Sequence, residues 1–362
     1  IGGKYYFFRL TVELALIFFI LWWAFEARNG EALEAIKSLC SKPLFLAVSA
    51  FVLFLLLASV FAEDPATAFW SNFERGEGGF QFLHYYAFFV LMILLFKTKD
   101  DWKAFFVTAV VVSCLMVFYG VLANLGVDEK FVSPYQGGNR PEGLLDRIVR
   151  TRFQGSLGNP SYVAPYLMFA IFYVSYLWAS GRKRGGWWRI AGYSFLLLAF
   201  LFFMILSQTR GAFLGLGAAV FAFLAYLVLS AKGGARKAAL AVLIVLVLTA
   251  ALLYANRHNE FFGKVPGGRL IQFDFSADSF STRFWTWGSA WKGFLERPRL
   301  GWGPENFSAV FDKYFDPRHF VPGQNTETWF DRAHSVFFDY LAEAGILGLL
   351  SYLSIFAVFY FH

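Results

Sequence analysis

A histidine stands at the entrance to an otherwise apolar stretch near the end of the chain, in "DRAHSVFFDYLAEAGILGLLSYL" from Asp331. An imidazole gains and loses its proton near neutral pH, so a histidine at the mouth of a membrane span can serve as a general base. If one helix continues through this stretch, Gly345 and Gly348 lie on the same face as His334. Small residues on that face allow a neighbouring helix to approach closely. The alternative is that His334 only caps the span and the glycines only serve packing.

Arginines are the second group that could do chemistry, because four of them lie at or near the ends of apolar runs: Arg150, Arg152, Arg210 and Arg283. The planar guanidinium matches phosphate oxygens and stays charged beside apolar surroundings, which suits the diphosphate headgroup of a lipid. Arg210 is the most constrained, since "SQTRGA" leaves only a short turn between two runs. The alternative for any one arginine is that it reaches lipid phosphate without a specific ligand.

Carboxylates in or beside apolar runs are a third kind of candidate. On a continuous helix Asp339 and Glu343 point roughly away from His334, so we expect Glu343 to be a structural partner, and Glu13 in the first run likewise. The sequence has no DxD triplet for a divalent metal, no Walker-type loop and no GxSxG or HExxH motif. Chemistry on a phosphate leaving group would therefore use arginines in place of a metal, with no cofactor.

Composition places the chain outside the soluble globular class, because 58% of its 362 residues are hydrophobic and only 16% are charged. We therefore predict a membrane protein. The formal net charge of +7 comes from short basic clusters between apolar runs, which is typical of membrane topology and not of nucleic-acid binding. Cys40 and Cys114 imply no disulfide framework. The chain starts without methionine and ends within an apolar run, so we expect further segments at both ends.

Nine apolar runs approach the roughly 20 residues that a membrane-spanning helix needs. They lie near residues 5–25, 44–62, 80–96, 104–125, 160–180, 188–207, 210–230, 238–255 and 334–360. Lysine and arginine collect in alternate connections, which predicts that these connections face the cytoplasm and the others face outward. The outward connection at 256–333 is long enough to be functional, and its "STRFWTWGSAWKGFLERP" predicts an amphipathic helix at the interface.

The predicted fold is therefore all-α, a polytopic membrane helical bundle with one outer-face subdomain. Residues 1–255 are expected to hold the first eight transmembrane helices, residues 256–333 the large outer loop, and residues 334–362 the final transmembrane helix of this chain.

Four ordered pieces of the chain resemble the superfamily of O-antigen ligases and O-antigen polymerases. "HSVFFDYLAEAGILG" fits the signature of His, then Asn, Ser or Gln, nine residues, Gly, two residues and Gly. "FQGSLGNPSYVAPYL", "SQTRGAFLGL" and "STRFWTWGSAWKGFLERPRLGWGPENF" are similar in order and setting. The resemblance covers about residues 150–350.

This resemblance implies an integral glycosyltransferase of the bacterial inner membrane that moves a glycan from undecaprenyl diphosphate to an acceptor on the outer, periplasmic face. The acceptor is lipid A core in ligases, a growing glycan in polymerases and a protein hydroxyl in the related O-oligosaccharyltransferases. His334 would be the general base, and Arg210 and Arg283 would hold the diphosphate without a metal, with Arg152 a looser match. The implied partners are the lipid-linked glycan, the acceptor and the bilayer.

A transporter of lipid-linked glycans is the alternative from another functional class. Such a protein is expected to carry polar or broken helices at the bilayer midplane, related by an internal repeat. The sequence contains no such repeat, and its candidate charged residues gather near one edge of the predicted spans. This pattern favours an enzyme.

Overall fold

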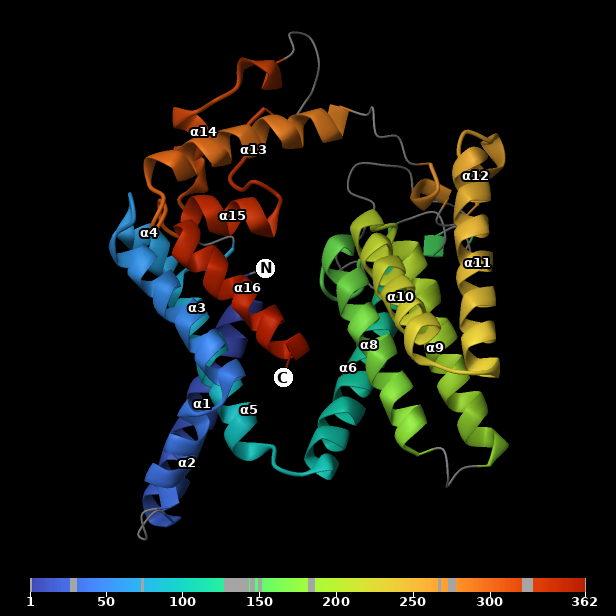
Figure 1. Ribbon diagram of the computed structural model, residues 1–362, viewed down its shortest axis with the longest axis horizontal. Coiled ribbons are helices and arrows are strands. Elements are labelled where there is room, and N and C mark those ends of the chain that lie inside the picture. Colours follow the sequence, from blue (N-terminus) through green and yellow to red (C-terminus); the bar gives the residue numbers. More distant parts are fainter. Residues whose placement is uncertain are drawn as a thin grey trace. The chain divides into compact units, whose positions relative to one another are not determined.

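The structure is a computed structural model that describes residues 2–26, 31–72, 75–126, 143, 147–148, 152–181, 186–265, 268–272, 278–320 and 328–361. The regular elements in these residues are all helices, so the predicted all-α class is confirmed. They form two compact units (Figure 1). Unit 1 comprises Ile1–Lys97 and Phe275–His362, and unit 2 comprises Thr98–Asp274.

Unit 1 combines both ends of the chain. Its helical elements are α1 (Gly2–Glu26), α2 (Glu31–Cys40), α3 (Pro43–Val60), α4 (Pro65–Trp70), α5 (Gly79–Leu95), α13 (Asp278–Glu296), α14 (Phe307–Lys313), η3 (Pro317–His319), α15 (Val336–Glu343) and α16 (Gly345–Phe361). Helix α3 packs against α16 and α5, and α5 packs against α1. Helices α13, α14 and α15 pack on one another and lie at the end of the bundle where α4 is found (Figure 1).

Unit 2 is built around one central helix, α8 (Pro160–Ser180), which packs against three others. Its elements are α6 (Lys99–Leu125), α8 (Pro160–Ser180), α9 (Trp187–Ser207), α10 (Arg210–Ser230), α11 (Gly234–Ala255), α12 (Glu260–Lys264) and η2 (Gly268–Leu270). Helix α8 packs against α6, α9 and α10 and places Val163, Leu167 and Val174 wholly inside the core. Helices α10 and α11 instead keep most of their apolar side chains on the outside, as expected where the surroundings are lipid.

The predicted apolar runs correspond to helices. Among the described residues, seven helices are long and apolar enough to cross a membrane, namely α1, α3, α6, α8, α9, α10 and α11. Helices α5 and α16 are apolar as well but shorter, at 17 residues each. The stretch predicted to be an amphipathic helix in the long outer connection is also helical, as α13.

The prediction of one continuous helix from residue 334 to 360 is wrong. Helix α15 ends at Glu343, with Ala344 as its C-cap, and α16 starts at Gly345, whose backbone is left-handed with φ +63°. Gly345 and Gly348 therefore belong to a different helix from the one that follows His334, and they do not lie beneath it on one face.

The break has a tertiary cause, because the segment 298–303 runs beside it. Ile346 N donates to Pro298 O at 2.9 Å, while Trp302 N and Gly303 N donate to the carbonyls of residues 342 and 343 at 2.9 and 2.8 Å. A Cβ atom at Gly345 would come within 2.3 Å of Arg299 O. The glycine is required there for this close approach and for its positive φ.

Candidate active site

His334 lies in the short loop before α15, and its side chain is exposed. Its backbone has φ +54°, a left-handed conformation that is uncommon for residues other than glycine. The preceding residue, Ala333, is completely buried and held on both sides. Its N–H donates to Asp339 Oδ1 at 2.7 Å, and its carbonyl accepts from Trp287 Nε1 at 3.0 Å. The loop therefore presents the imidazole from a fixed backbone.

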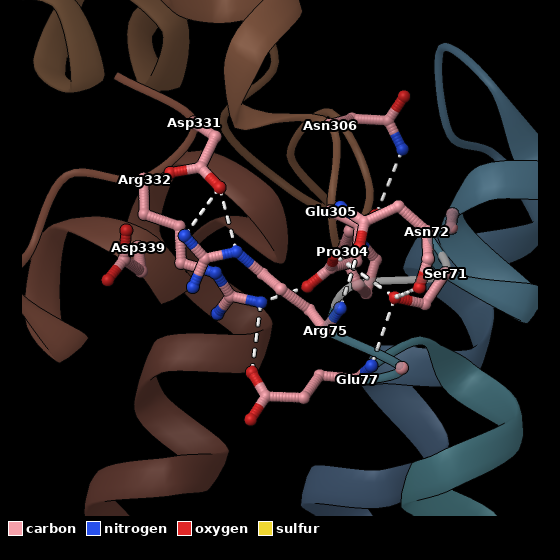
Figure 2. Close-up of polar contacts among 12 residues, drawn as sticks. Ser71, Asn72, Arg75, Glu77, Pro304, Glu305, Asn306, Asp331, Arg332 and Asp339 are labelled. Atoms are coloured by element: carbon pink, nitrogen blue, oxygen red, sulfur yellow. Dashed lines mark hydrogen bonds and ion pairs between the residues drawn. The ribbon is translucent and has the colours of Figure 1, made fainter. Parts of the chain in front are cut away.

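Two ion pairs fix the same loop to the connection between α4 and α5, as Figure 2 shows. Arg75 Nε donates to Asp331 Oδ2 at 2.7 Å. Arg332 pairs with Glu77, with 3.0 Å between Nη2 and Oε2, and also with Glu305. These contacts join segments that are far apart in the sequence, around residues 75, 305 and 332.

Glu305 links this arrangement to α4. Its side chain is nearly inaccessible, and its Oε2 accepts from Ser71 Oγ at 3.1 Å. The neighbouring Asn306 accepts from Asp64 N at 3.0 Å and donates from Nδ2 to Pro304 O at 2.9 Å. Asp64 is in turn the N-cap of α4, where it accepts from Ala66 N and Thr67 N. A capped helix therefore supports the loop that carries Glu305.

A pocket of about 270 Å³ lies among these residues, and we call it the acid pocket. It is lined by Leu55, Glu77, Phe82, Tyr85, Pro304, Glu305, Arg332, Val336, Asp339, Tyr340 and Glu343. Four carboxyl groups and one guanidinium thus share one small cavity. Among the charged residues that line the pocket, Glu343 is the most buried when backbone and side chain are counted together, with 4% of its surface exposed.

Burial governs the protonation of these acids. It raises the pKa of Asp339, Glu305 and Glu343, because a carboxylate loses hydration away from water, and the effect is largest for Glu343. Burial alone would lower the pKa of Arg332, but the negative charges of Glu343, Glu305 and Glu77 outweigh it and raise that pKa. The guanidinium therefore stays charged, whereas Glu343 keeps its proton to a higher pH than an exposed glutamate.

The structure places Arg283 in unit 1, on the exposed side of α13. It stands four residues before Trp287, about 6 Å along the helix axis. Trp287 binds the carbonyl of Ala333 and stacks on Phe338 with 5.1 Å between ring centroids. Arg283 and His334 are therefore carried by elements that contact each other directly.

Arg152 and Arg210 lie in unit 2, where they meet the same turn between α9 and α10. Arg152 Nε donates to Ser207 O at 3.3 Å, and Phe153 N donates to Leu206 O at 2.9 Å. Arg210 starts α10 and donates from Nη2 to Gln272 O at 2.9 Å. The structure thus brings two of the predicted arginines to one end of unit 2. Arg150 lies outside the described residues.

Sequence reasoning missed most of the residues that hold the histidine loop. Asp331 and Arg332 are visible near His334, and Glu305 lies within the "GPENF" piece, but nothing in the sequence pairs them with Arg75 or Glu77. The prediction that Glu343 and Asp339 point away from His334 assumed a continuous helix. In the folded chain Asp339 instead binds the backbone next to the histidine.

The residues present do not suggest a metal centre in the described part of the chain. No group of three or more His, Cys, Asp or Glu side chains there has an arrangement that could hold a metal ion. Three of the acids of the pocket, Glu77, Glu305 and Asp339, are instead paired with arginine, hydroxyl or backbone partners.

Comparison with known proteins supports the resemblance predicted from the motifs. The family model described as O-antigen ligase matches residues 193–353, a range that contains Arg210, Arg283, His334 and both motif glycines but not Arg152. A search of the curated proteins finds no match. Over residues 193–353 the chain is therefore similar to the O-antigen ligase domain, and this similarity supports a membrane glycosyltransferase of the ligase and polymerase type.

Proposed function

We propose that this protein is a lipid-linked glycan ligase. It takes a glycan from undecaprenyl diphosphate and joins it to an acceptor hydroxyl, such as one of lipid A core, at the periplasmic face of the bacterial inner membrane. The observation that carries the proposal is His334 of the family signature, held exposed on a fixed backbone within the matched range. A general base needs this combination of access to substrate and defined position.

In the proposed reaction, His334 removes the proton from the acceptor hydroxyl. The oxygen attacks the anomeric carbon of the glycan, a new glycosidic bond forms, and the bond to the phosphate oxygen breaks with its electrons going to undecaprenyl diphosphate. A single displacement of this kind inverts the anomeric centre. Arg283 is proposed to contact the diphosphate, and the resemblance extends that role to Arg210 and Arg152. Positive charge stabilises the leaving group most in the transition state, where its negative charge grows.

The position of the loop within unit 1 agrees with a site on the outer face. Lys42 precedes α3 and Lys97 follows α5, and both belong to connections whose basic residues predict the cytoplasmic side. The histidine loop contacts residues 75 and 77 in the connection at the opposite ends of these two helices. The position of the histidine loop away from the basic connections of unit 1 supports a site on the outer face.

The test is glycan transfer by the purified full-length protein in detergent, with undecaprenyl-diphosphate glycan, candidate acceptors and a chelator. We expect transfer to persist with the chelator and to fall by at least about a hundredfold in His334→Ala, the lower range for a general base. His258→Ala removes another exposed histidine, beyond α11, and is expected to keep full activity. Equal activity of both variants would contradict the role of His334.

A polymerase or a protein O-oligosaccharyltransferase would use the same donor and differ in the acceptor. A ladder of product lengths from a single defined acceptor would indicate a polymerase, and transfer to a protein hydroxyl would indicate the third activity. Movement of the glycan across vesicles without cleavage of the phosphate bond would favour a transporter.

A further inference from the structure

The acid pocket has the size of a site for one small ring. Its volume of about 270 Å³ lies just below the range of about 300–1,000 Å³ that is usual for drug-sized ligands. Three aromatic side chains line it, Phe82, Tyr85 and Tyr340, together with the carboxyl groups. A mixture of aromatic faces and a few polar groups is typical of a small-molecule site.

One polar atom in the pocket lacks a partner. Glu343 Oε1 is buried and forms no hydrogen bond within the described part of the chain, although the rest of the cluster is well paired. A buried polar atom without a partner is unfavourable, and native proteins rarely leave one without a reason. A hydroxyl group of a bound molecule would satisfy it.

The charges of the pocket restrict the kind of ligand. Glu77, Glu305, Asp339 and Glu343 face a single guanidinium, that of Arg332, which is already shared by Glu77 and Glu305. The outer pair of Arg75 and Asp331 adds no net charge. A phosphate or a uronic acid would be repelled, whereas a neutral molecule with hydroxyl groups would not.

The pocket adjoins the segment that carries His334. Arg332 and Val336, two residues before and two residues after the histidine, both line it. Since consecutive Cα atoms are 3.8 Å apart, each lies within about 8 Å of the His334 Cα atom. A molecule held in the pocket is therefore bound next to the proposed base.

We infer that the acid pocket binds one neutral, hydroxyl-rich sugar ring, with Glu343 as a hydrogen-bonding partner. This inference rests on the proposed function, since the ring belongs either to the acceptor or to the glycan of the donor. Glu343 suits this ligand because its carboxyl group in the protonated form both donates and accepts a hydrogen bond, while Glu77 and Glu305 remain paired with Arg332.

Saturation-transfer NMR tests binding without any transfer reaction. The probes are the methyl glycosides of glucose, galactose, mannose and N-acetylglucosamine, with methyl glucuronide and glucose 6-phosphate as anionic counterparts, added to the full-length protein in detergent. We expect transfer of saturation to at least one neutral glycoside and to neither anion. Binding of no neutral glycoside, or equal binding of the anions, would overturn the inference.

Variants of residues that line the acid pocket test whether the glycoside binds there. Glu343→Gln is expected to weaken it about tenfold, the effect of one lost hydrogen bond to a polar group. Val336→Trp fills the pocket from a half-exposed position, so it tests the site even if Glu343→Gln fails to fold. Glu34→Gln, at an exposed position on α2, is the matched control and is expected to bind like wild type. Unchanged binding in Val336→Trp would exclude this pocket.

The transfer assay then separates the two sources of the ring. If the ring is part of the acceptor, Glu343→Gln raises the KM for the acceptor and leaves the KM for the donor unchanged. If the ring is part of the donor, Glu343→Gln raises the KM for the donor and leaves the KM for the acceptor unchanged. If the wild-type protein shows no glycan transfer, this result counts against the proposed ligase activity but does not affect the NMR result. Failure of the proposed function and failure of the sugar-binding inference are therefore distinguishable.

Discussion

Arg332 is the residue on which the histidine loop depends most, because it is the cation shared by Glu305 and Glu77 and lies near Glu343. Arg332→Ala would leave buried carboxylates without their counter-charge, and we expect it to destabilise the protein by about 3–5 kcal/mol. Thermal unfolding in detergent measures this. Arg318→Ala removes an arginine that pairs with Asp316 at the surface and is expected to change the unfolding temperature little. Similar shifts in both variants would contradict this account.

Glu343 gives stability a predictable dependence on pH. Its pKa in the folded protein lies well above the ordinary value of 4.5, so above pH 4.5 the folded state holds a proton that the unfolded chain has lost. The stability linked to this proton is fully present below pH 4.5 and disappears as pH rises through the folded pKa. From pH 4.5 towards neutral pH, the free energy of unfolding of Glu343→Gln should therefore rise relative to that of wild type, by up to about 1.4 kcal/mol per pH unit. The unfolding temperature of the variant should rise relative to wild type in the same direction. A difference in unfolding temperature between Glu343→Gln and wild type that stays constant across this pH range would contradict the raised pKa of Glu343. The unfolding temperature of the control variant Glu34→Gln should change with pH as that of wild type does.

Individual residues show what a single sequence can reveal about the site. His334 and the arginines could be named as candidates because their residue types and their positions beside apolar runs suit the chemistry proposed for them. The partners of Arg332 were not, since Glu77 and Glu305 come from distant loops that only the folded chain brings together. Asp339 was placed on the wrong side because its contact with Ala333 depends on a loop and not on helical spacing.

At the scale of elements, the break between α15 and α16 depends on Gly345. Alanine there would adopt a left-handed backbone that costs about 1–3 kcal/mol, and its Cβ would also clash with Arg299 O at 2.3 Å. We expect Gly345→Ala to lower the unfolding temperature clearly. Gly215→Ala in α10 has nothing within 4 Å of the new Cβ and should stabilise the helix by about 0.5–1 kcal/mol. A tolerated Gly345→Ala would mean that the break is not required.

The elements also show why helices were easier to predict than their ends. Each apolar run is helical because a backbone in lipid must satisfy its hydrogen bonds within the segment. The last run continues with good helix formers on both sides of Gly345, so its composition predicts one helix. The segment 298–303 takes up backbone hydrogen bonds at residues 342–346, and this competition cannot be read from local sequence.

At the scale of the whole molecule, each unit has connections with basic residues at one end of its long helices. In unit 1 these are the ends near Lys42 and Lys97, and in unit 2 they include the connection between α10 and α11 with Lys232 and Arg236. The opposite ends carry the histidine loop in unit 1 and the turn at Arg210 in unit 2. Because both units sit in one bilayer, basic connections are expected on the same, cytoplasmic side in each.

Cysteine labelling tests this orientation in both units. Cys40 is exposed near the basic end of unit 1 and supplies the first site in a Cys114→Ser background. With Cys40→Ser as well, Ala66→Cys in α4, Ala235→Cys beside Arg236 and His258→Cys beyond α11 supply one further exposed site each.

A membrane-impermeant maleimide should label positions 66 and 258 in intact spheroplasts, and positions 40 and 235 only in inverted vesicles. Labelling of 40 and 66 from one side would refute the topology of unit 1, and labelling of 235 and 258 from one side would refute that of unit 2. Opposite orientation of the two units would exclude Arg210 from the proposed diphosphate contact and would leave Arg283 as the proposed contact.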